Sequence, residues 1–292
     1  MALLPRVQHD MPPTGHLLNK LNAKGVSMLD QSNAERTLYG FWLSPYMSQV
    51  AHFLSETGLN YRYERVSPFQ GSTLTPEHKE RNPLGKIPTL SDINGVNISE
   101  SQAICRYLAR IYPEARRFYP IDDPLLCAEI DAKNDYIAFS IAGPFFNWFV
   151  VSAYFPKAWK LNVEKEAHTY SLCSVLMTKM WLTRLVNGSK MEPFLFGNEP
   201  FLPDFQLFYT LELSQMFSEL FEMPEMHLFR DDAILQKFYY AMCERASTRE
   251  ILMAKESELD VTKNELFGGF GEAYLDKHID RGILEKVFGH TV

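Results

Sequence analysis

The stretch NPLGKIPTL, residues 82–90, has a proline on each side of Gly85 and leads directly into an apolar segment. Proline fixes its own φ angle and lacks a backbone donor, so this segment keeps a free backbone edge. One interpretation is that Pro83 and Pro88 only delimit a loop and that Lys86 is solvated. The other is that Ile87-Pro88 is a cis peptide whose neighbouring N–H and C=O groups face a bound peptide. The stretch alone leaves both open.

The residues that follow this stretch predict a hairpin and then a helix. Two apolar segments, 87–91 and 96–98, flank Asn94-Gly95, which is the strongest short signal for a tight antiparallel turn. Apolar residues at three-to-four spacing then predict a helix over 100–112.

The residues before the stretch predict a strand, a helix and a second strand. Segment 36–42 is rich in aromatic and β-forming residues, and segment 61–66 is similar. Between them, a helix begins at Pro45 and ends at Gly58, which is a common residue at a helix C-terminus. Together with the hairpin, this order predicts a thioredoxin-like α/β domain with a four-stranded mixed sheet.

The remainder of the chain has a different pattern. Beyond the short polar connector between Pro120 and Pro124, helical periodicity replaces strand alternation and predicts an all-helical bundle. We therefore expect a mobile arm over 1–35, a thioredoxin-like domain over 36–115, and an all-helical domain with a C-terminal extension over 122–292.

Composition limits the function. The net charge of −7 is spread over 29 basic and 36 acidic residues, so we expect no nucleic-acid partner. The four cysteines form no CxxC pair, which favours a reducing, cytoplasmic location. No stretch approaches the roughly 20 apolar residues of a membrane span. The eight histidines show no metal-ligand spacing, so no metal is expected.

The first candidate functional segment is Ser44-Pro45-Tyr46-Met47, where the first predicted strand meets the first helix. Serine followed by proline is a common start of a helix and needs no function. A hydroxyl at the positive end of a helix could equally hold an anion. Both interpretations remain open at this point.

The second candidate segment is Ser99-Glu100-Ser101-Gln102, at the start of a helix. Ser99 and Gln102 have the spacing of a capping box, which is a purely structural role. Alternatively, the helix N-terminus with Ser101 could bind a carboxylate while Glu100 binds an ammonium group. Together these groups would hold an amino-acid head group.

With these three segments in this order, residues 38–112 resemble the N-terminal domain of the glutathione transferase superfamily, most closely the theta class, with some likeness to the tau class. The resemblance implies that Ser44 hydrogen-bonds the sulfur of glutathione and that the protein is a homodimer. It also implies a set of glutathione-binding residues: Lys86, Ile87, Pro88, Glu100 and Ser101.

A free thiol has a pKa of about 8.5, so catalysis requires stabilisation of the thiolate, which is the nucleophile. We expect attack on a small apolar electrophile by conjugation, dehalogenation or ether cleavage, in a detoxification role. Aromatic residues near Ser44, and others near a predicted helix break at Gly143-Pro144, could line the electrophile pocket, although most such residues are simply core. The candidates are Trp42, Tyr46, Phe145, Phe146 and Phe149.

One departure from the theta pattern supports an alternative function. The theta class has basic residues for the glycine carboxylate near Thr73, and the stretch 71–74 has none, so Lys86 would carry that charge alone. A non-catalytic carrier of glutathione or of a hydrophobic ligand is therefore the alternative. An interaction scaffold with a transferase fold is a further one.

Overall fold

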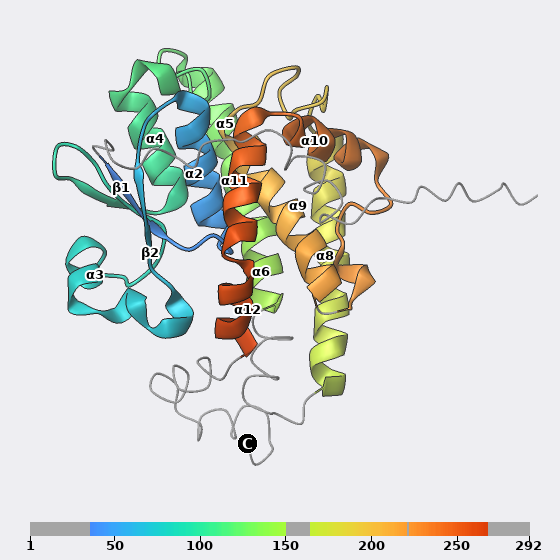
Figure 1. Cartoon of the computed structure of the whole chain (residues 1–292). Helices are drawn as coiled ribbons and strands as arrows, with labels where there is room; N and C mark the ends of the chain where they lie inside the picture. Colours follow the sequence, from blue (N-terminus) through green and yellow to red (C-terminus); the bar gives the residue numbers. More distant parts are fainter. Residues whose placement is uncertain (1–35, 150–163, 221, 268–292) are drawn as a thin grey trace, which may run out of the picture. The chain divides into compact units, whose positions relative to one another are not determined.

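A four-stranded mixed sheet lies in the N-terminal part of the chain (Figure 1). The computed structural model describes residues 36–149, 164–220 and 222–267. The strands are β1 (Thr37–Gly40), β2 (Arg62–Arg65), β3 (Thr89–Ser91) and β4 (Asn97–Ser99), in the order β2-β1-β3-β4. β1 pairs in parallel with β2 and antiparallel with β3, which forms the predicted hairpin with β4. The predicted thioredoxin-like sheet is confirmed, whereas the predicted arm over 1–35 lies outside the described residues.

Local sequence explains why α2 (Pro45–Thr57) begins and ends where it does. The Ser44 side chain accepts the N–H of Met47, and Pro45 occupies the first turn, where a missing donor costs nothing. Gly58 ends the helix with a φ of 70°, a conformation that glycine adopts without strain. The predicted helix from Pro45 to Gly58 is therefore confirmed.

The predicted capping box at the start of α4 (Ser101–Ile111) is wrong. Glu100 is the N-cap residue and makes no side-chain capping bond. The Gln102 amide instead donates to Gln206 at 2.8 Å. Gln102 therefore bonds a residue that is distant in sequence instead of capping the helix.

The segment between β2 and β3 is more regular than its turn-rich composition indicates. It contains the short helix α3 (Pro76–Arg81) and two single 3₁₀ turns, η2 (Pro68–Gln70) and η3 (Ser72–Leu74). Thr75 starts α3 by accepting the N–H of His78 at 3.3 Å. This helix borders the stretch 82–90.

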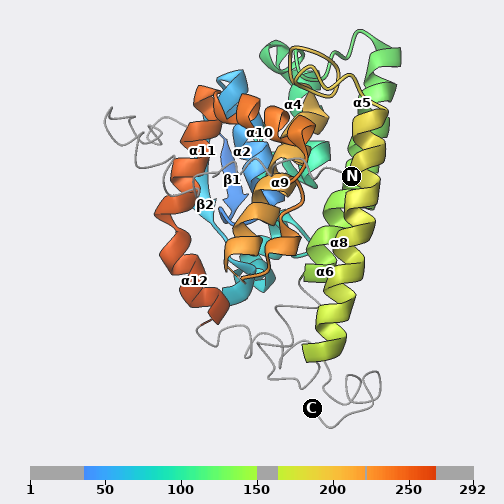
Figure 2. The same ribbon diagram turned by 90° about the vertical axis from the view of Figure 1, so that its right-hand side faces the viewer.

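Among the described residues beyond 122, the named secondary-structure elements are helical, as predicted. They are α5 (Pro124–Tyr136), η5 (Ile137–Ala142), α6 (Gly143–Phe149), α8 (Glu164–Asn187), α9 (Leu202–Leu220), η7 (Pro224–Met226), α10 (Ala233–Cys243), α11 (Ala246–Ser257) and α12 (Leu259–Phe267). A further 3₁₀ turn, η4 (Pro113–Ala115), follows α4. α8 packs along η5 and α6 (Figure 2). No helix in the described ranges is both long and apolar enough to cross a membrane.

The predicted helix break at Gly143-Pro144 is also wrong, because η5 continues into α6 through a π-helical turn. The Gly143 N–H bonds the carbonyl of Ala138, five residues earlier. A Cβ atom at position 143 would lie 2.7 Å from that carbonyl oxygen. Glycine is therefore required here by the close approach of the backbone.

α9 forms the centre of the hydrophobic core and packs against both α2 and α5. His52 and Phe53 of α2 contact the ring of Phe205, with centroid distances of 4.8 and 5.9 Å. At its N-terminus, the fully buried Asp204 accepts the N–H groups of Leu195 and Phe201 at 2.9 and 2.8 Å. Burial nevertheless raises the pKa of Asp204 to about 7.

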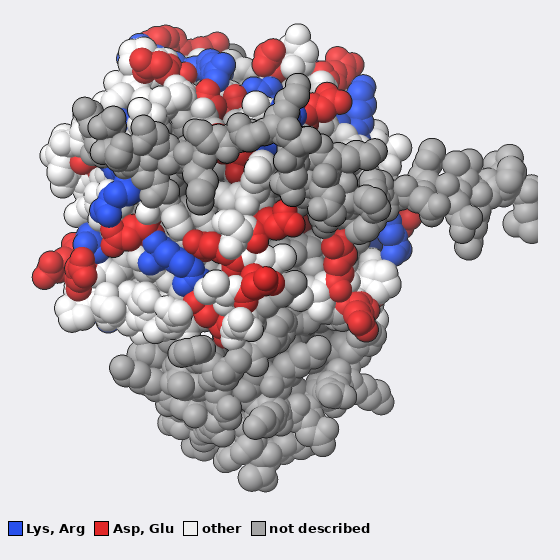
Figure 3. Space-filling model, in the orientation of Figure 1, with Lys and Arg blue, Asp and Glu red and all other residues white. Residues whose placement is uncertain are grey.

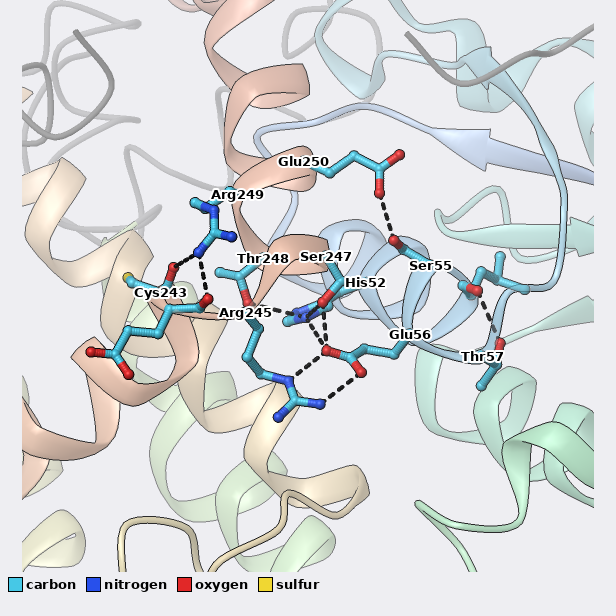
Figure 4. Close-up of polar contacts among 12 residues, drawn as sticks. His52, Ser55, Glu56, Thr57, Cys243, Arg245, Ser247, Thr248, Arg249 and Glu250 are labelled. Atoms are coloured by element: carbon cyan, nitrogen blue, oxygen red, sulfur yellow. Dashed lines mark hydrogen bonds and ion pairs between the residues drawn. The ribbon is translucent and has the colours of Figure 1, made fainter. Parts of the chain in front are cut away.

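A polar cluster joins α2 to the start of α11 (Figure 4). The Glu56 carboxylate accepts two bonds from Arg245, at 2.5 and 2.8 Å, and one from the Ser247 hydroxyl at 2.5 Å. The buried His52 contacts Ser247 and Thr248 through the same ring nitrogen, at 3.1 and 3.2 Å. This cluster attaches the start of α11 to the C-terminal half of α2.

Candidate functional site

Ser44 lies at the corner between β1 and α2. Its Oγ accepts the N–H of Met47 at 3.3 Å, so the predicted structural role as a cap is confirmed. A hydroxyl can accept such a bond and still donate its own proton. Within the described part of the chain, no acceptor takes the Ser44 proton. Capping and anion binding are therefore compatible at this residue.

The stretch 82–90 brings Lys86 and Ile87 to the start of β3. Because β3 pairs with both β1 and β4, the predicted free backbone edge of this strand is wrong. Ile87-Pro88 is a cis peptide, as one of the two interpretations of the sequence predicted. The Cβ of Ile87 lies 4.0 Å from the position that a Cβ on Gly40, the last residue of β1, would occupy. Lys86 is exposed, and its ammonium pairs with no acid in the described ranges.

Glu100 and Ser101 lie at the N-terminus of α4. Glu100 is exposed and has φ 68° and ψ 115°, an unusual conformation for a residue other than glycine. Such strain persists only where the surroundings impose it, and it is concentrated at functional sites. Beside it, Ser101 opens the helix with its hydroxyl and the free N–H groups of the first turn. The pair has the chemistry to hold an amino-acid head group.

Tyr46, the second residue of α2, links the corner to the helical part of the chain. Its ring lies edge-on to Phe146 of α6, with 6.1 Å between centroids. Burial, with a smaller contribution from the Glu100 carboxylate, raises the pKa of Tyr46 to about 12. The phenol therefore stays neutral at physiological pH.

The other predicted pocket residues do not share this contact. Trp42 is buried, and its ring packs against Tyr63 with 4.9 Å between centroids. Phe145 is buried beside its half-buried neighbour Phe146. The side chain of Phe149 lies outside the described residues. Tyr46 and Phe146 are thus the two predicted pocket residues that the structure brings together.

Sequence reasoning missed the polar network around Arg65, at the end of β2. Arg65 contacts Glu258 at 3.1 Å and Glu265 of α12 at 2.8 Å. Glu265 is almost fully buried and also accepts bonds from Ser67 and Gln70, at 2.6 and 2.7 Å. Figure 3 shows acidic side chains over α11 and α12 next to basic side chains over β2. No local pattern could reveal these partners, since they lie about 200 residues away in sequence.

This network changes which cations are available near the corner. Arg65 is the nearest basic residue before the stretch 71–74, and the carboxylates of Glu258 and Glu265 already pair with it. Lys86 remains exposed and unpaired with any described acid. Among the described residues, no group of three or more His, Cys, Asp or Glu side chains could hold a metal ion.

Comparison with known proteins shows what the N-terminal part is similar to. The family model for the glutathione S-transferase N-terminal domain matches residues 34–110. Residues 34–110 are therefore similar to a glutathione S-transferase N-terminal domain. Curated relatives agree over this transferase domain: glutathione S-transferase 4 of Zea mays is 38% identical over 73 residues, and a zeta-class glutathione S-transferase of Euphorbia esula is 35% identical over 109 residues.

The curated matches cover only part of each protein. The aligned stretches span 25% and 37% of this chain, and 32% and 44% of the maize and Euphorbia proteins. This sequence likeness therefore extends little beyond the transferase N-terminal domain.

Solved structures extend the likeness of fold to the helical part. Human glutathione transferase theta-2, in complex with glutathione, has a TM-score of 0.66 at 21% identity and covers 82% of this chain and 97% of that chain. Glutathione transferase F2 of Populus trichocarpa has a TM-score of 0.64 at 20% identity and covers 76% and 99%. The chain thus has the two-part fold of glutathione transferases, with the transferase N-terminal domain followed by a helical region.

Proposed function

We propose that this chain is a serine-type, theta-like glutathione transferase in which Ser44 activates the sulfur of glutathione. The observation that carries the proposal is the Ser44 hydroxyl, which lies at the N-terminus of α2 and has no described acceptor for its proton. A thiolate placed at this corner would accept that proton as a hydrogen bond. The match of residues 34–110 to the transferase domain supports this assignment.

Two features of the corner favour the anionic sulfur. The Ser44 hydroxyl donates a hydrogen bond, worth about 1 kcal/mol or more to a charged acceptor. The positive end of α2 adds roughly 0.3–1 kcal/mol. Each lowers the thiol pKa, so a larger fraction of the bound sulfur is thiolate at neutral pH. Ser44 acts by hydrogen bonding and need not transfer a proton.

The rest of glutathione is held along the sheet edge. Glu100 and Ser101 bind the amino and carboxyl groups of the γ-glutamyl residue, and the Ile87-Pro88 backbone contacts the cysteinyl unit. Lys86 faces the glycine carboxylate, whereas Arg65 is already paired with Glu258 and Glu265. A glutathione-binding domain over 36–115 would thus carry all of these groups.

The electrophile binds against Tyr46 and Phe146, where a half-buried phenol meets an apolar ring. An apolar, aromatic molecule suits this wall, and conjugation, dehalogenation or ether cleavage are the reactions that an activated thiolate performs on it. Trp42, Phe145 and Phe149 are further candidates for the pocket. The helical domain, 122–292, would thus determine which electrophile is accepted.

We further propose that the protein is a cytoplasmic homodimer with a detoxification role. Support for the homodimer comes from large apolar side chains that are exposed on η5 and α8. These two helices are neighbours in the structure. These side chains are Phe139, Leu176, Met177 and Met180. A second copy of the chain would cover them.

Conjugation of glutathione to 1-chloro-2,4-dinitrobenzene tests the proposal. Ser44→Ala should lower kcat/KM at least tenfold, because about 1.4 kcal/mol of thiolate stabilisation corresponds to a factor of ten. Ser44→Thr keeps the hydroxyl and serves as the matched control. The pKa of bound glutathione, followed by thiolate absorbance, should rise in the alanine variant. Unchanged turnover in Ser44→Ala would remove Ser44 from the mechanism.

A non-catalytic carrier is the second candidate. It is favoured by the absence of basic residues over 71–74, together with the engagement of Arg65. In that case calorimetry would show tight binding of glutathione or of a hydrophobic ligand, and a broad panel of electrophiles would give no conjugation. Conjugation of any electrophile above the uncatalysed rate would contradict the carrier function.

A further inference from the structure

Three side chains converge on one backbone oxygen, the carbonyl of Lys86. His78 contacts it through Nε2 at 2.9 Å, and the Asn82 amide donates to it at 2.8 Å. The Thr89 hydroxyl lies at 3.4 Å. His78 and Asn82 are each only 1% exposed, so water does not compete for these bonds.

The sequence of α3 accounts for this arrangement. Thr75 caps the helix by accepting the His78 N–H, which places His78 in the first turn with its ring toward the stretch 82–90. Asn82 follows the helix, and its Oδ1 accepts the N–H of Leu84 at 3.1 Å. Gly85 closes the turn with a φ of 61°, where a Cβ would lie 3.1 Å from the carbonyl of Thr73.

The carbonyl determines the tautomer of His78. Because an oxygen accepts, Nε2 must carry the hydrogen. The other nitrogen, Nδ1, is buried and has no hydrogen-bond partner among the residues that the structure describes. The ring therefore donates one hydrogen bond, from Nε2 to the Lys86 carbonyl.

Fixing this carbonyl also fixes the next N–H. The C=O and N–H of one trans peptide point in opposite directions across a rigid plane. The Lys86 carbonyl points toward His78 and Asn82, so the Ile87 N–H points away from α3. Within the described ranges, this N–H donates to no acceptor. It is a free donor next to Gly40, the last residue of β1, after which the chain leads to Ser44.

We propose that His78 and Asn82 are positioning residues that orient the Lys86–Ile87 peptide, so that the Ile87 N–H donates to a peptide carbonyl of bound glutathione. The inference rests on the proposed function. It gives the buried His78 and Asn82 an indirect role in recognising the peptide backbone of the ligand. Neither residue touches the ligand itself.

The decisive variant is His78→Phe, which keeps an aromatic ring and removes the donor. We expect the KM for glutathione to rise five- to tenfold while kcat at saturating glutathione changes less than twofold, since Ser44 is untouched. His78→Gln supplies an amide donor and should return the KM to within threefold of the wild type. The exposed Glu80→Gln on the same helix is the matched control.

Asn82→Asp is a second, independent variant. It keeps the oxygen that accepts the Leu84 N–H and removes the donor to Lys86, so the KM should again rise at least fivefold. A direct readout is the amide ¹⁵N–¹H resonance of Ile87, which should shift on adding glutathione to the wild type and shift at least twofold less in either variant.

The outcomes separate the two proposals. A wild-type chain that neither binds glutathione nor shifts the Ile87 resonance would refute the proposed function, and this inference with it. If the wild type binds and both variants bind equally well, the positioning role is overturned and the proposed function stands. A fall in kcat with unchanged KM would likewise overturn the positioning role.

Discussion

The rings of Tyr46 and Phe146 meet edge-on, 6.1 Å apart, and join the second residue of α2 to α6 of the helical region. Edge-to-face pairs of this kind contribute about 0.5–1.5 kcal/mol beyond the area that they bury. The contact lies two residues from Ser44. A ligand bound at this corner would therefore meet residues of both parts of the chain.

Phe146→Ala should weaken the binding of an aromatic electrophile and leave glutathione binding unchanged. Loss of one aromatic contact predicts a rise of about three- to tenfold in the KM for 1-chloro-2,4-dinitrobenzene. Steady-state kinetics with each substrate varied in turn would measure it. Phe139→Ala, an exposed phenylalanine of η5, is the control. Equal effects on both KM values would contradict a pocket at Phe146.

Glu265→Gln should loosen α12 from β2 and η2. The buried carboxylate accepts bonds from Arg65, Ser67 and Gln70, and loss of its charge should cost about 1–3 kcal/mol. Amide hydrogen exchange over 259–267 should become faster. The exposed Glu256→Gln on α11 is the control. Equal exchange in the two variants would show that the network does not hold α12.

Glu56 should make the protein less stable in acid. Despite burial, the hydrogen bonds from Arg245, His52 and Ser247 lower the pKa of Glu56 below its ordinary value of 4.5. The unfolded chain therefore binds more protons, so this stabilisation is complete above pH 4.5 and is lost as the pH falls further. Denaturant unfolding between pH 3 and 7 should show Glu56→Gln less stable at pH 7, with the difference shrinking in acid. A difference that does not change with pH would contradict this.

Asp204 should have the opposite effect. Burial raises its pKa to about 7, from an ordinary value of 3.8. The folded chain then binds the proton more tightly, so the unfolding free energy should fall as the pH rises from about 4 to 7. Asp204→Asn keeps the side-chain shape and should remove this slope. If both proteins gave the same slope over this range, the carboxyl would be ionised throughout in the folded state.

Leu176→Glu should disrupt a homodimer that forms through α8. Leu176 is 67% exposed, and a charge at the centre of an apolar interface leaves a desolvated carboxylate. Light scattering coupled to size exclusion should give a monomer mass for the variant and a dimer mass for the wild type. Ile234→Glu, which alters an exposed isoleucine of α10, should remain dimeric. A monomeric wild type would refute the proposed dimer.

Local patterns predicted the parts of the fold that local contacts determine. Ser44, Pro45 and Gly58 define the ends of α2 through bonds and backbone angles within the helix itself, so its bounds were predictable. The cis peptide at Ile87-Pro88 was one of two predicted possibilities, and the structure selects it.

The predictions failed where distant residues compete for a side chain or where helix geometry changes. Gln102 bonds Gln206, 104 residues away, instead of closing a capping box. Gly143 joins a π-helical turn, whereas its composition with Pro144 resembles a break. For the candidate site, motif residues were predictable one by one, but the contact of Tyr46 with Phe146 depends on how two distant helices pack.

The π-helical turn of η5 also determines the rotation of α6 about its own axis, and so the direction in which each side chain of α6 points. A bond across five residues instead of four accommodates one extra residue, and each residue turns a helix by about 100°. Removing one residue from 137–142 would rotate α6 by that angle. Phe146 would then swing away from Tyr46 and a neighbouring side chain would take its direction. A one-residue deletion far from Ser44 in sequence would thus change which side chain faces Tyr46 while Ser44 itself stays in place.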